Sequence, residues 1–218
     1  MRVFIPILLI PLFFNCVSTS LIKSCKNPEY PTFVPKNILV IGVTPDTETR
    51  KAFEFRTIKE LNTRSVNALQ SHVVFEKSFQ DSKKTELEIE AQIDKLIEVG
   101  YDAILISVVK GIENNISYSG KSSKLDYRLR KFIGYFLAYQ DAYFKQNFYD
   151  RYNVYTIETS LYSLKNDSDI PRIWYMTYDL VNPKDINKSI NNYVKVVIKS
   201  LEKEGFISKK PREQFQLD

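Results

Sequence analysis

Two cysteines, one histidine and a set of scattered carboxylates are the side chains of this 218-residue chain that could do chemistry. Cys16 ends an apolar run, Cys25 follows it, and His72 is the single histidine. A zinc site needs three or four ligands close together, and no cysteine lies beside this histidine. His72 is therefore expected to be a structural or surface residue, and neither a metal site nor a cofactor is predicted.

Six carboxylates lie at or near the ends of expected strands: Asp46, Glu48, Asp102, Glu113, Glu158 and Asp179. General acid–base catalysis needs two carboxylates in different environments, and the sequence does not single out such a pair. The motifs of serine hydrolases, zinc proteases and P-loop enzymes are absent. Six glycines in the whole chain are too few for a glycine-rich phosphate cradle. We predict no catalytic residues and no enzymatic activity.

The apolar run before Cys16 has the features of an export signal. Residues 3–14 are apolar, contain two prolines, and follow Met1 and Arg2. A transmembrane helix needs roughly 17 to 25 apolar residues, whereas this length fits the core of a secretory signal. We therefore predict a signal peptide over residues 1–15.

The stretch "LFFNC" resembles the lipobox of bacterial lipoproteins, in which the cysteine receives a diacylglycerol thioether and becomes the first residue of the mature chain. Asn15 stands where Gly, Ala or Ser is usual, and relaxed lipoboxes of this kind resemble those of Bacteroidetes-type bacteria. The resemblance implies lipidation of Cys16 and a lipid-anchored protein of the bacterial cell envelope, at the outer membrane facing the periplasm. A secretory signal cleaved nearby and an uncleaved anchor remain alternatives.

A lipidated Cys16 leaves Cys25 without a partner for an internal disulfide. Residues 16–36 also contain three prolines, which disfavour regular structure. We predict that this range is the lipidated cysteine followed by a flexible tether.

An aromatic and basic segment over residues 126–155 is the expected contact surface if the chain binds a partner. Tyrosine and arginine dominate interface hot spots because they bury a large area and keep a polar tip. The candidate binding residues are Arg128, Arg130, Tyr135, Tyr139 and Tyr143. In the alternative interpretation, a helical stripe of Phe132, Phe136, Tyr139 and Tyr143 closes the edge of the core.

The charge pattern restricts the class of partner. The chain has 31 basic and 26 acidic residues, spread along its length, and carries no motif that would read or stack bases. Nucleic acid is therefore not an expected partner. The predicted partners are the membrane, through the N-terminal lipid, and an envelope protein or peptidoglycan.

Residues 37–207 are predicted to form a single α/β domain, followed by a polar tail over 208–218. Three strands are expected, at 37–43, in "SVNALQSHVVF" and at 101–110. A helix to about Arg64 follows the first strand, and a helix over 84–99 follows the second. Gly100 is placed to end the second helix. The inward positions expected for these helices are Ala52, Phe55, Ile58 and Leu61, then Leu87, Ile93, Leu96 and Ile97. A βαβαβ order predicts parallel strands.

The second half of the chain changes character. "YNVYTIETSLYSL" and "RIWYMTYDLV" predict an antiparallel β-hairpin added to the sheet. An amphipathic C-terminal helix ending at Gly205 should lie on that sheet, with a stripe of Ile186, Ile190, Tyr193, Val194, Val197, Ile198 and Leu201. The predicted fold class is α/β, a two-layer or three-layer sandwich.

Taken together, these core patterns resemble small bacterial envelope lipoproteins of unknown function. The stretches that carry the resemblance are "NILVIGVTPDTETRKAFEFRTIKELNTRSVNALQS", "YDAILISVVKG", "IETSLYSL", "IWYMTYDL" and "VVIKSLEKEGFI". At fold level they are also similar to lipoproteins that activate penicillin-binding proteins and to the N-terminal domain of the Tol-system periplasmic protein. The resemblance implies a non-enzymatic binding or envelope-assembly module. A hydrolase acting on envelope glycans or lipids, and a small-ligand sensor, are the alternatives.

Overall fold

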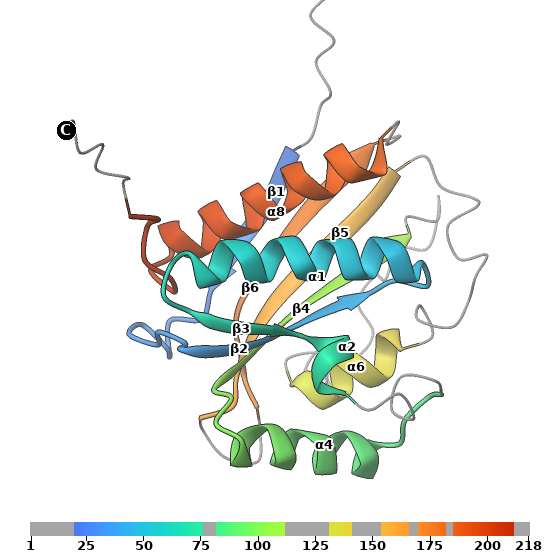
Figure 1. The fold of residues 1–218 in the computed structure, drawn as a ribbon, viewed down its shortest axis with the longest axis vertical. Helices are drawn as coiled ribbons and strands as arrows, with labels where there is room; N and C mark the ends of the chain where they lie inside the picture. The colour runs from blue at the N-terminus through green and yellow to red at the C-terminus, as the bar shows by residue number, and fades with distance from the viewer. Residues whose placement is uncertain are drawn as a thin grey trace, which may run out of the picture.

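Six strands form one mixed sheet in the order β1-β6-β5-β4-β2-β3 (Figure 1). The computed structural model describes residues 20–75, 82–111, 131–140, 154–165, 170–181 and 185–211. The strands are β1 (Ser20–Lys26), β2 (Asn37–Val43), β3 (Asn67–Gln70), β4 (Ala103–Gly111), β5 (Val154–Ser163) and β6 (Arg172–Val181). The helices are α1 (Thr47–Asn62), α2 (Ser71–Val74), α4 (Glu86–Glu98), α6 (Phe132–Tyr139) and α8 (Ile186–Lys203).

The first half of the sheet is parallel, as predicted. Strand β2 pairs in parallel with both β3 and β4. Ile38, Leu39, Val40 and Ile41 are each 0% exposed, so both faces of β2 are covered. The continuous apolar run of β2 is thus explained by burial of both faces of the strand.

The second half of the sheet is antiparallel. Strand β5 pairs with β4 and β6, which confirms that the hairpin extends the sheet. Residues 166–169, which connect the two hairpin strands, lie outside the described residues.

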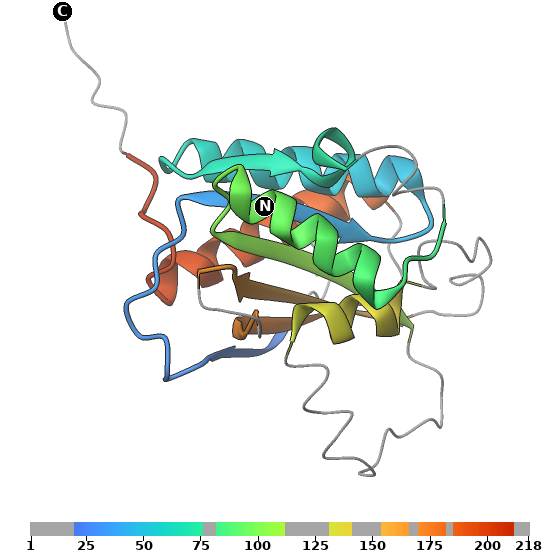
Figure 2. The same ribbon diagram turned by 90° about the horizontal axis from the view of Figure 1, so that it is seen from below.

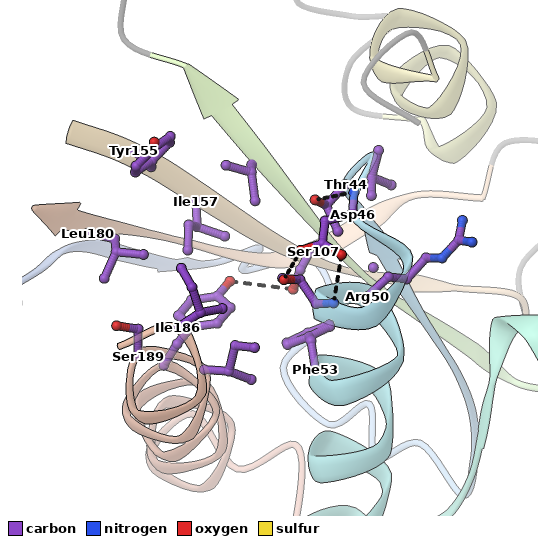
Figure 3. Close-up of a pocket in the computed structure, with 16 residues that line it drawn as sticks. Thr44, Asp46, Arg50, Phe53, Ser107, Tyr155, Ile157, Leu180, Ile186 and Ser189 are labelled. Atoms are coloured by element: carbon purple, nitrogen blue, oxygen red, sulfur yellow. Dashed lines mark hydrogen bonds between the residues drawn. The ribbon is translucent and has the colours of Figure 1, made fainter. Parts of the chain in front are cut away.

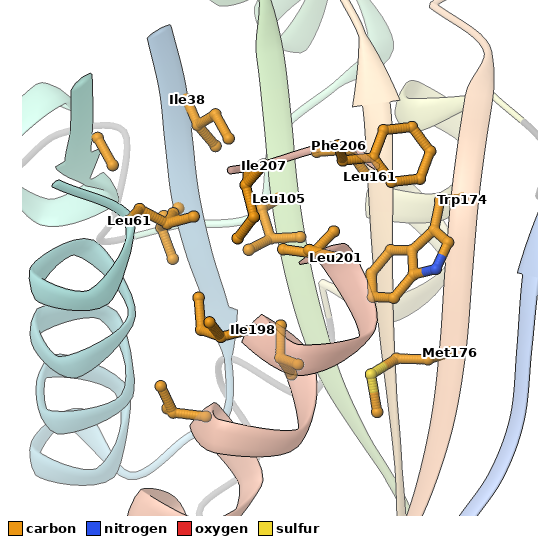
Figure 4. Close-up of a cluster of buried hydrophobic side chains, with 14 of the residues drawn as sticks. Ile38, Leu61, Leu105, Leu161, Trp174, Met176, Ile198, Leu201, Phe206 and Ile207 are labelled. Carbon is orange, nitrogen blue, oxygen red and sulfur yellow. The ribbon is translucent and has the colours of Figure 1, made fainter. Parts of the chain in front are cut away.

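Helices cover both faces of the sheet, giving three layers (Figure 2). Helices α1 and α8 pack on one face, around Trp174, Leu201 and Phe206 (Figure 4). Helices α4 and α6 pack on the other face, where Ile93 and Phe136 contact the core. An ion pair also joins the turn after α1 to the adjacent helix α8, with the Arg64 Nε 2.6 Å from the Glu202 Oε1.

Local signals set the helix ends. Asp46 caps α1, and Thr85 forms a capping box with Glu88 at the start of α4. Gly100 and Gly205 follow α4 and α8 with φ of 91° and 79°, the left-handed conformation that ends many helices. Both glycines end helices where the sequence predicted.

Several residues predicted to face inward are exposed. Phe55 is 57% exposed, Leu87 76%, Ile97 45% and Ile186, at the start of the predicted C-terminal stripe, 48%. Helix α1 instead buries Phe53, Glu54, Thr57 and Leu61, and α4 buries Ile89, Ile93 and Leu96. The stripe predicted for α1 follows a strict three-residue spacing, which drifts around a helix of 3.6 residues per turn. The buried residues of α1 and α4 combine spacings of three and four, as an amphipathic helix requires.

The predicted tether does not extend through residues 20–26. These residues form β1, an edge strand that pairs antiparallel with β6. The Ser24 hydroxyl accepts a hydrogen bond from the Trp174 indole N–H at 3.1 Å and lies 3.0 Å from the Ser200 hydroxyl. The proline-rich stretch is therefore a connection between two strands of one sheet. Residues 16–19 lie outside the described residues.

No helix in the described ranges combines the length and the apolar character that a membrane span requires. Of the predicted polar tail, residues 208–211 are described and exposed.

Candidate functional site

A pocket opens at the carboxyl ends of the parallel strands β2 and β4 (Figure 3). From β2 the chain passes through α1 to β3 on one side of the sheet, whereas β4 lies on the other side of β2. The connections that leave these two adjacent strand ends therefore run to opposite sides, from β2 to β3 and from β4 to β5, which makes this a topological switch point. In open α/β sheets this is the usual position of a ligand site.

The pocket has a volume of about 190 Å³ and mostly apolar walls. Its wall residues come from β2, α1, β4, β5, β6 and α8, so six elements must pack together to form it. The aliphatic and phenylalanine side chains of the walls are Val43, Phe53, Val109, Ile157, Leu180, Ile186 and Ile190. Figure 3 shows Ile157, Leu180 and Ile186 on one side, opposite Phe53 and Ser107.

Three hydroxyl groups lie beneath the apolar walls. The Ser107 Oγ is 2.7 Å from the Thr159 Oγ1, and the Tyr193 hydroxyl donates to the Ser107 Oγ at 3.4 Å. Thr159 and Tyr193 are also hydrogen-bonded to each other, which closes a triangle. Burial raises the pKa of Tyr193, so its phenol stays neutral at physiological pH.

Asp46 provides the carboxylate of the pocket. Its Oδ1 accepts from the backbone N–H of Glu48 at 3.0 Å and of Thr49 at 3.4 Å, and its Oδ2 accepts from the Thr49 hydroxyl at 2.8 Å. The Thr49 hydroxyl is the main cause that lowers the pKa of Asp46 below its ordinary value. Asp46 therefore carries a negative charge at neutral pH.

Gly42 and Glu54 hold α1 close to the end of β2. A Cβ at Gly42 would lie 3.2 Å from the Phe53 Cδ1, so glycine permits this close approach. The Glu54 carboxylate is 0% exposed and accepts from the Gly42 N–H at 2.9 Å. It also accepts from the Ser71 hydroxyl at 2.6 Å, and its Oε2 lies 3.3 Å from the His72 Nδ1. His72 thus has the structural role expected from the sequence.

The predicted lipidation site and the predicted binding residues divide into three groups. Cys16, Arg128, Arg130 and Tyr143 lie outside the described residues. Tyr135 is 1% exposed, so its ring belongs to the core rather than to an exposed surface. Tyr139 is half-buried, and the ammonium of Lys110 lies 4.7 Å from its ring centroid. Within helix α6, Phe132 and Phe136 close the edge of the core, as in the alternative interpretation.

Of the carboxylates that the sequence singled out, Glu158 and Asp102 lie away from Asp46. Glu158 is a residue of β5, on the face of the sheet that α6 covers. Its Oε2 lies 2.9 Å from the Lys110 Nζ, and its Oε1 lies 3.6 Å from an Arg172 guanidinium nitrogen. Asp102 accepts from the N–H groups of Lys36 and Asn37 at the opposite end of the sheet from Asp46. Glu113 lies outside the described residues, whose side chains contain no cluster of three or more potential metal ligands.

Sequence reasoning missed Glu54 and the pocket. A signal for Glu54 was present, because it lies seven positions before Leu61 and three before Thr57, on the buried face of α1. The pocket had no comparable local signal, because its walls meet through the register of β4, β5 and β6.

Comparison with known proteins gives neither a matching family model nor a matching curated protein. Among solved structures, the PelC dodecamer from Paraburkholderia phytofirmans is similar, with 8% identity and a TM-score of 0.45 over 84% of this chain and 97% of that chain. Lipoprotein GNA1162 from Neisseria meningitidis has 15% identity and a TM-score of 0.38 over 77% and 96%. TM-scores below 0.5 do not transfer a function. The similarity to penicillin-binding-protein activators and to the Tol-system domain stays a prediction.

Proposed function

We propose that this chain is a non-enzymatic binding protein of the bacterial cell envelope, anchored by lipid on Cys16, and that the pocket at the ends of β2 and β4 receives its partner. The pocket itself is the observation that carries the proposal, because apolar walls with a few polar groups are typical of binding sites. The partner expected from the sequence is an envelope protein or peptidoglycan.

The chemistry of the pocket supports binding rather than catalysis. Asp46 is the single carboxylate among the residues that line it, so the lining does not supply a pair of carboxyl groups. The hydroxyls of Ser107 and Tyr193 bond to each other and to Thr159. The hydrolase alternative therefore gains no support from this site.

The position of the proposed anchor relative to the pocket also supports the proposal. Ser20 pairs with Asp179, the neighbour of the pocket residue Leu180. Cys16 precedes Ser20 by four positions, which even in full extension span at most about 14 Å. A lipid on Cys16 would hold the pocket end of the sheet close to the membrane surface. An outer-membrane position facing the periplasm belongs to the same proposal.

Site-specific photocrosslinking in cells tests the binding role. Ile186 lies at the pocket and is 48% exposed, whereas Val99 is 73% exposed and lies outside the pocket. A photoreactive residue at position 186 should give a discrete crosslinked envelope component, and the same residue at position 99 should not. The product should disappear when Val109→Phe fills the pocket. Identical patterns from both positions, or none from position 186, would contradict the proposal.

Mass spectrometry of the protein extracted from membranes tests the anchor. The wild type should carry a diacylglycerol thioether on Cys16, and Cys16→Ser should lose both the added mass and the membrane retention. An unmodified Cys16 in the wild type would remove the anchor from the proposal and leave the pocket to be tested separately.

A small-ligand sensor is the second candidate, and the size of the pocket favours it. The volume of about 190 Å³ is below the roughly 300–1,000 Å³ of sites that enclose a drug-sized molecule, so a ligand held entirely inside would be small. A sensor would bind such a molecule without yielding a macromolecular crosslink from position 186.

A further inference from the structure

The volume of the pocket selects a ligand group of about one aromatic ring. A dry cavity of about 150 Å³ in another protein binds benzene, and this pocket measures about 190 Å³. The pocket also has an open mouth, so a ring that enters it can be free or attached to a larger molecule. The group inside is then a single ring or a branched aliphatic chain of similar bulk.

The walls favour an aromatic ring. Phe53, Tyr155 and Tyr193 line the pocket from three different elements, and the Phe53 and Tyr193 rings already contact each other with centroids 5.8 Å apart. Ring pairs at separations of 4.5–7 Å gain stabilisation beyond the apolar area that they bury. The aliphatic side chains of Ile157 and Leu180 complete the walls.

The hydroxyl triangle can accept a hydrogen bond from a ligand more readily than it can donate one. Each of the three hydroxyls has one proton, and the three mutual contacts among Ser107, Thr159 and Tyr193 use all three protons. Lone pairs remain, and of these three residues Ser107 and Tyr193 line the pocket. A ligand that reaches them should therefore bring its own donor.

The charged groups at the pocket also favour a neutral ligand that donates a hydrogen bond. Asp46 lines it with an ionised carboxylate, which repels a ring that carries a carboxylate or phosphate. The guanidinium of Arg50 points away from Ile157 and Leu180 (Figure 3). A neutral ring with a hydrogen-bond donor therefore suits both the hydroxyls of Ser107 and Tyr193 and the carboxylate of Asp46.

We infer that the pocket binds a phenolic ring, with its hydroxyl donating to the Ser107 Oγ and its body between Phe53, Ile157 and Leu180. This inference names the ligand class of the proposed binding site and so rests on the function proposed above. A free phenolic compound and a tyrosine side chain of a partner protein share this chemistry.

The test uses the full-length protein in lipid nanodiscs, with the isoleucine methyl groups labelled for NMR. Ile157, Ile186 and Ile190 line the pocket, and a bound ring shifts the resonances of nearby methyl groups. The probes are p-cresol, toluene, N-acetyl-tyrosinamide and octanoate, with aqueous concentrations fixed by dialysis so that partition into lipid does not affect the comparison. Val109→Phe fills the pocket, and Val99→Phe is the matched control on an exposed site.

We expect p-cresol to bind about 2- to 10-fold more tightly than toluene, as one neutral hydrogen bond predicts. A purely apolar pocket gives the opposite order, because it buries the phenol hydroxyl without a partner. Val109→Phe should weaken binding at least tenfold, and Val99→Phe should leave it unchanged. If N-acetyl-tyrosinamide binds at least as tightly as p-cresol, the source is a tyrosine side chain; if it binds tenfold more weakly, the source is a free phenol.

Three results would overturn the inference: toluene binding as tightly as p-cresol, octanoate binding more tightly than either, or no shift at the three isoleucines. The first two would leave the proposed binding role in place with another ligand class, whereas the crosslinking from position 186 tests that role independently. If Val109→Phe does not fold, the order of p-cresol and toluene on the wild type still decides the outcome.

Discussion

The hydroxyl of Ser71 donates a hydrogen bond of 2.6 Å to the carboxylate of Glu54, a side chain that is 0% exposed. The same carboxylate accepts from the N–H of Gly42 at the end of β2. One buried acid on α1 thus connects a strand end, a helix and the start of α2. Because Gly42 and Phe53, the neighbour of Glu54, both line the pocket, this network holds the β2 and α1 walls together.

We expect Glu54→Gln to lower the free energy of unfolding by about 1–3 kcal/mol. Both carboxylate oxygens of Glu54 accept hydrogen bonds, and in glutamine an NH₂ group would replace one of these acceptors and face a donor. Glu90→Gln, at an exposed site on α4, is the matched control and should change stability by less than about 0.5 kcal/mol. Urea unfolding measures both. Equal effects of the two substitutions would show that the Glu54 network contributes nothing specific.

Two neighbouring tyrosines provide a matched test of the hydroxyl triangle. Tyr193 bonds to Ser107 and Thr159, whereas the buried Tyr178 hydroxyl has no hydrogen-bond partner among the described residues, although the two ring centroids are 5.1 Å apart. Tyr193→Phe should cost about 1–2 kcal/mol, and Tyr178→Phe should be neutral or stabilising. Thermal unfolding of the two variants distinguishes them, and a larger loss for Tyr178→Phe would contradict the assignment.

Gly42 lets α1 approach β2 at the pocket. In Gly42→Ala the new methyl group would lie 3.2 Å from the Phe53 ring, which is buried against Tyr193 and has little room to move. Overpacking of this kind costs about 1–3 kcal/mol. In the Phe53→Leu background the same substitution should cost less, because the ring that it meets is gone. Identical costs in both backgrounds would show that this contact is not the cause.

The N-cap of α1 predicts a pH dependence. The pKa of Asp46 is lowered in the folded chain, so its stabilisation is complete above the ordinary value of 3.8 and is lost as the pH falls through the folded value. Asp46→Ala should cost about 1 kcal/mol at pH 7, most of it from the cap, because the side chain is exposed and its charge is screened.

The difference between wild type and Asp46→Ala should therefore shrink when denaturant unfolding is measured below pH 3.8. Asp94→Ala, at an exposed position inside α4, gives the comparison without a cap. A difference for Asp46→Ala that stays constant down to pH 2 would contradict the prediction.

Much of the fold was predictable because its signals are local. The two-sided burial of β2, the left-handed glycines after α4 and α8, and the stripe from Ile190 to Leu201 each follow from a short stretch of sequence. The errors also have a local cause. A three-residue spacing placed Phe55 inward, but the helical period turns it toward solvent; Leu87 is likewise exposed, two positions before the first buried residue of α4, Ile89.

The strand β1 illustrates the opposite situation. Its sequence "SLIKSCK" follows an apolar leader and precedes three prolines, and that context favours a tether. Strand pairing with β6 and the bond from Trp174 to Ser24 decide otherwise, and both partners lie about 150 positions away. Contacts of such separation leave no mark in the local pattern.

The sequence by itself determined the α/β class, the alternation of β2, α1, β3, α4 and β4, the β5–β6 hairpin, the helix α8 and the export-signal-like run that ends at Cys16, because hydrophobic period, capping and turn chemistry act within a few residues. The tertiary structure alone decided where the pocket lies, that Glu54 is buried, and that Tyr135 belongs to the core rather than to a surface. These features arise from the register of strands and the crossing of α1 and α8 over the sheet, which bring together side chains that are far apart in the chain.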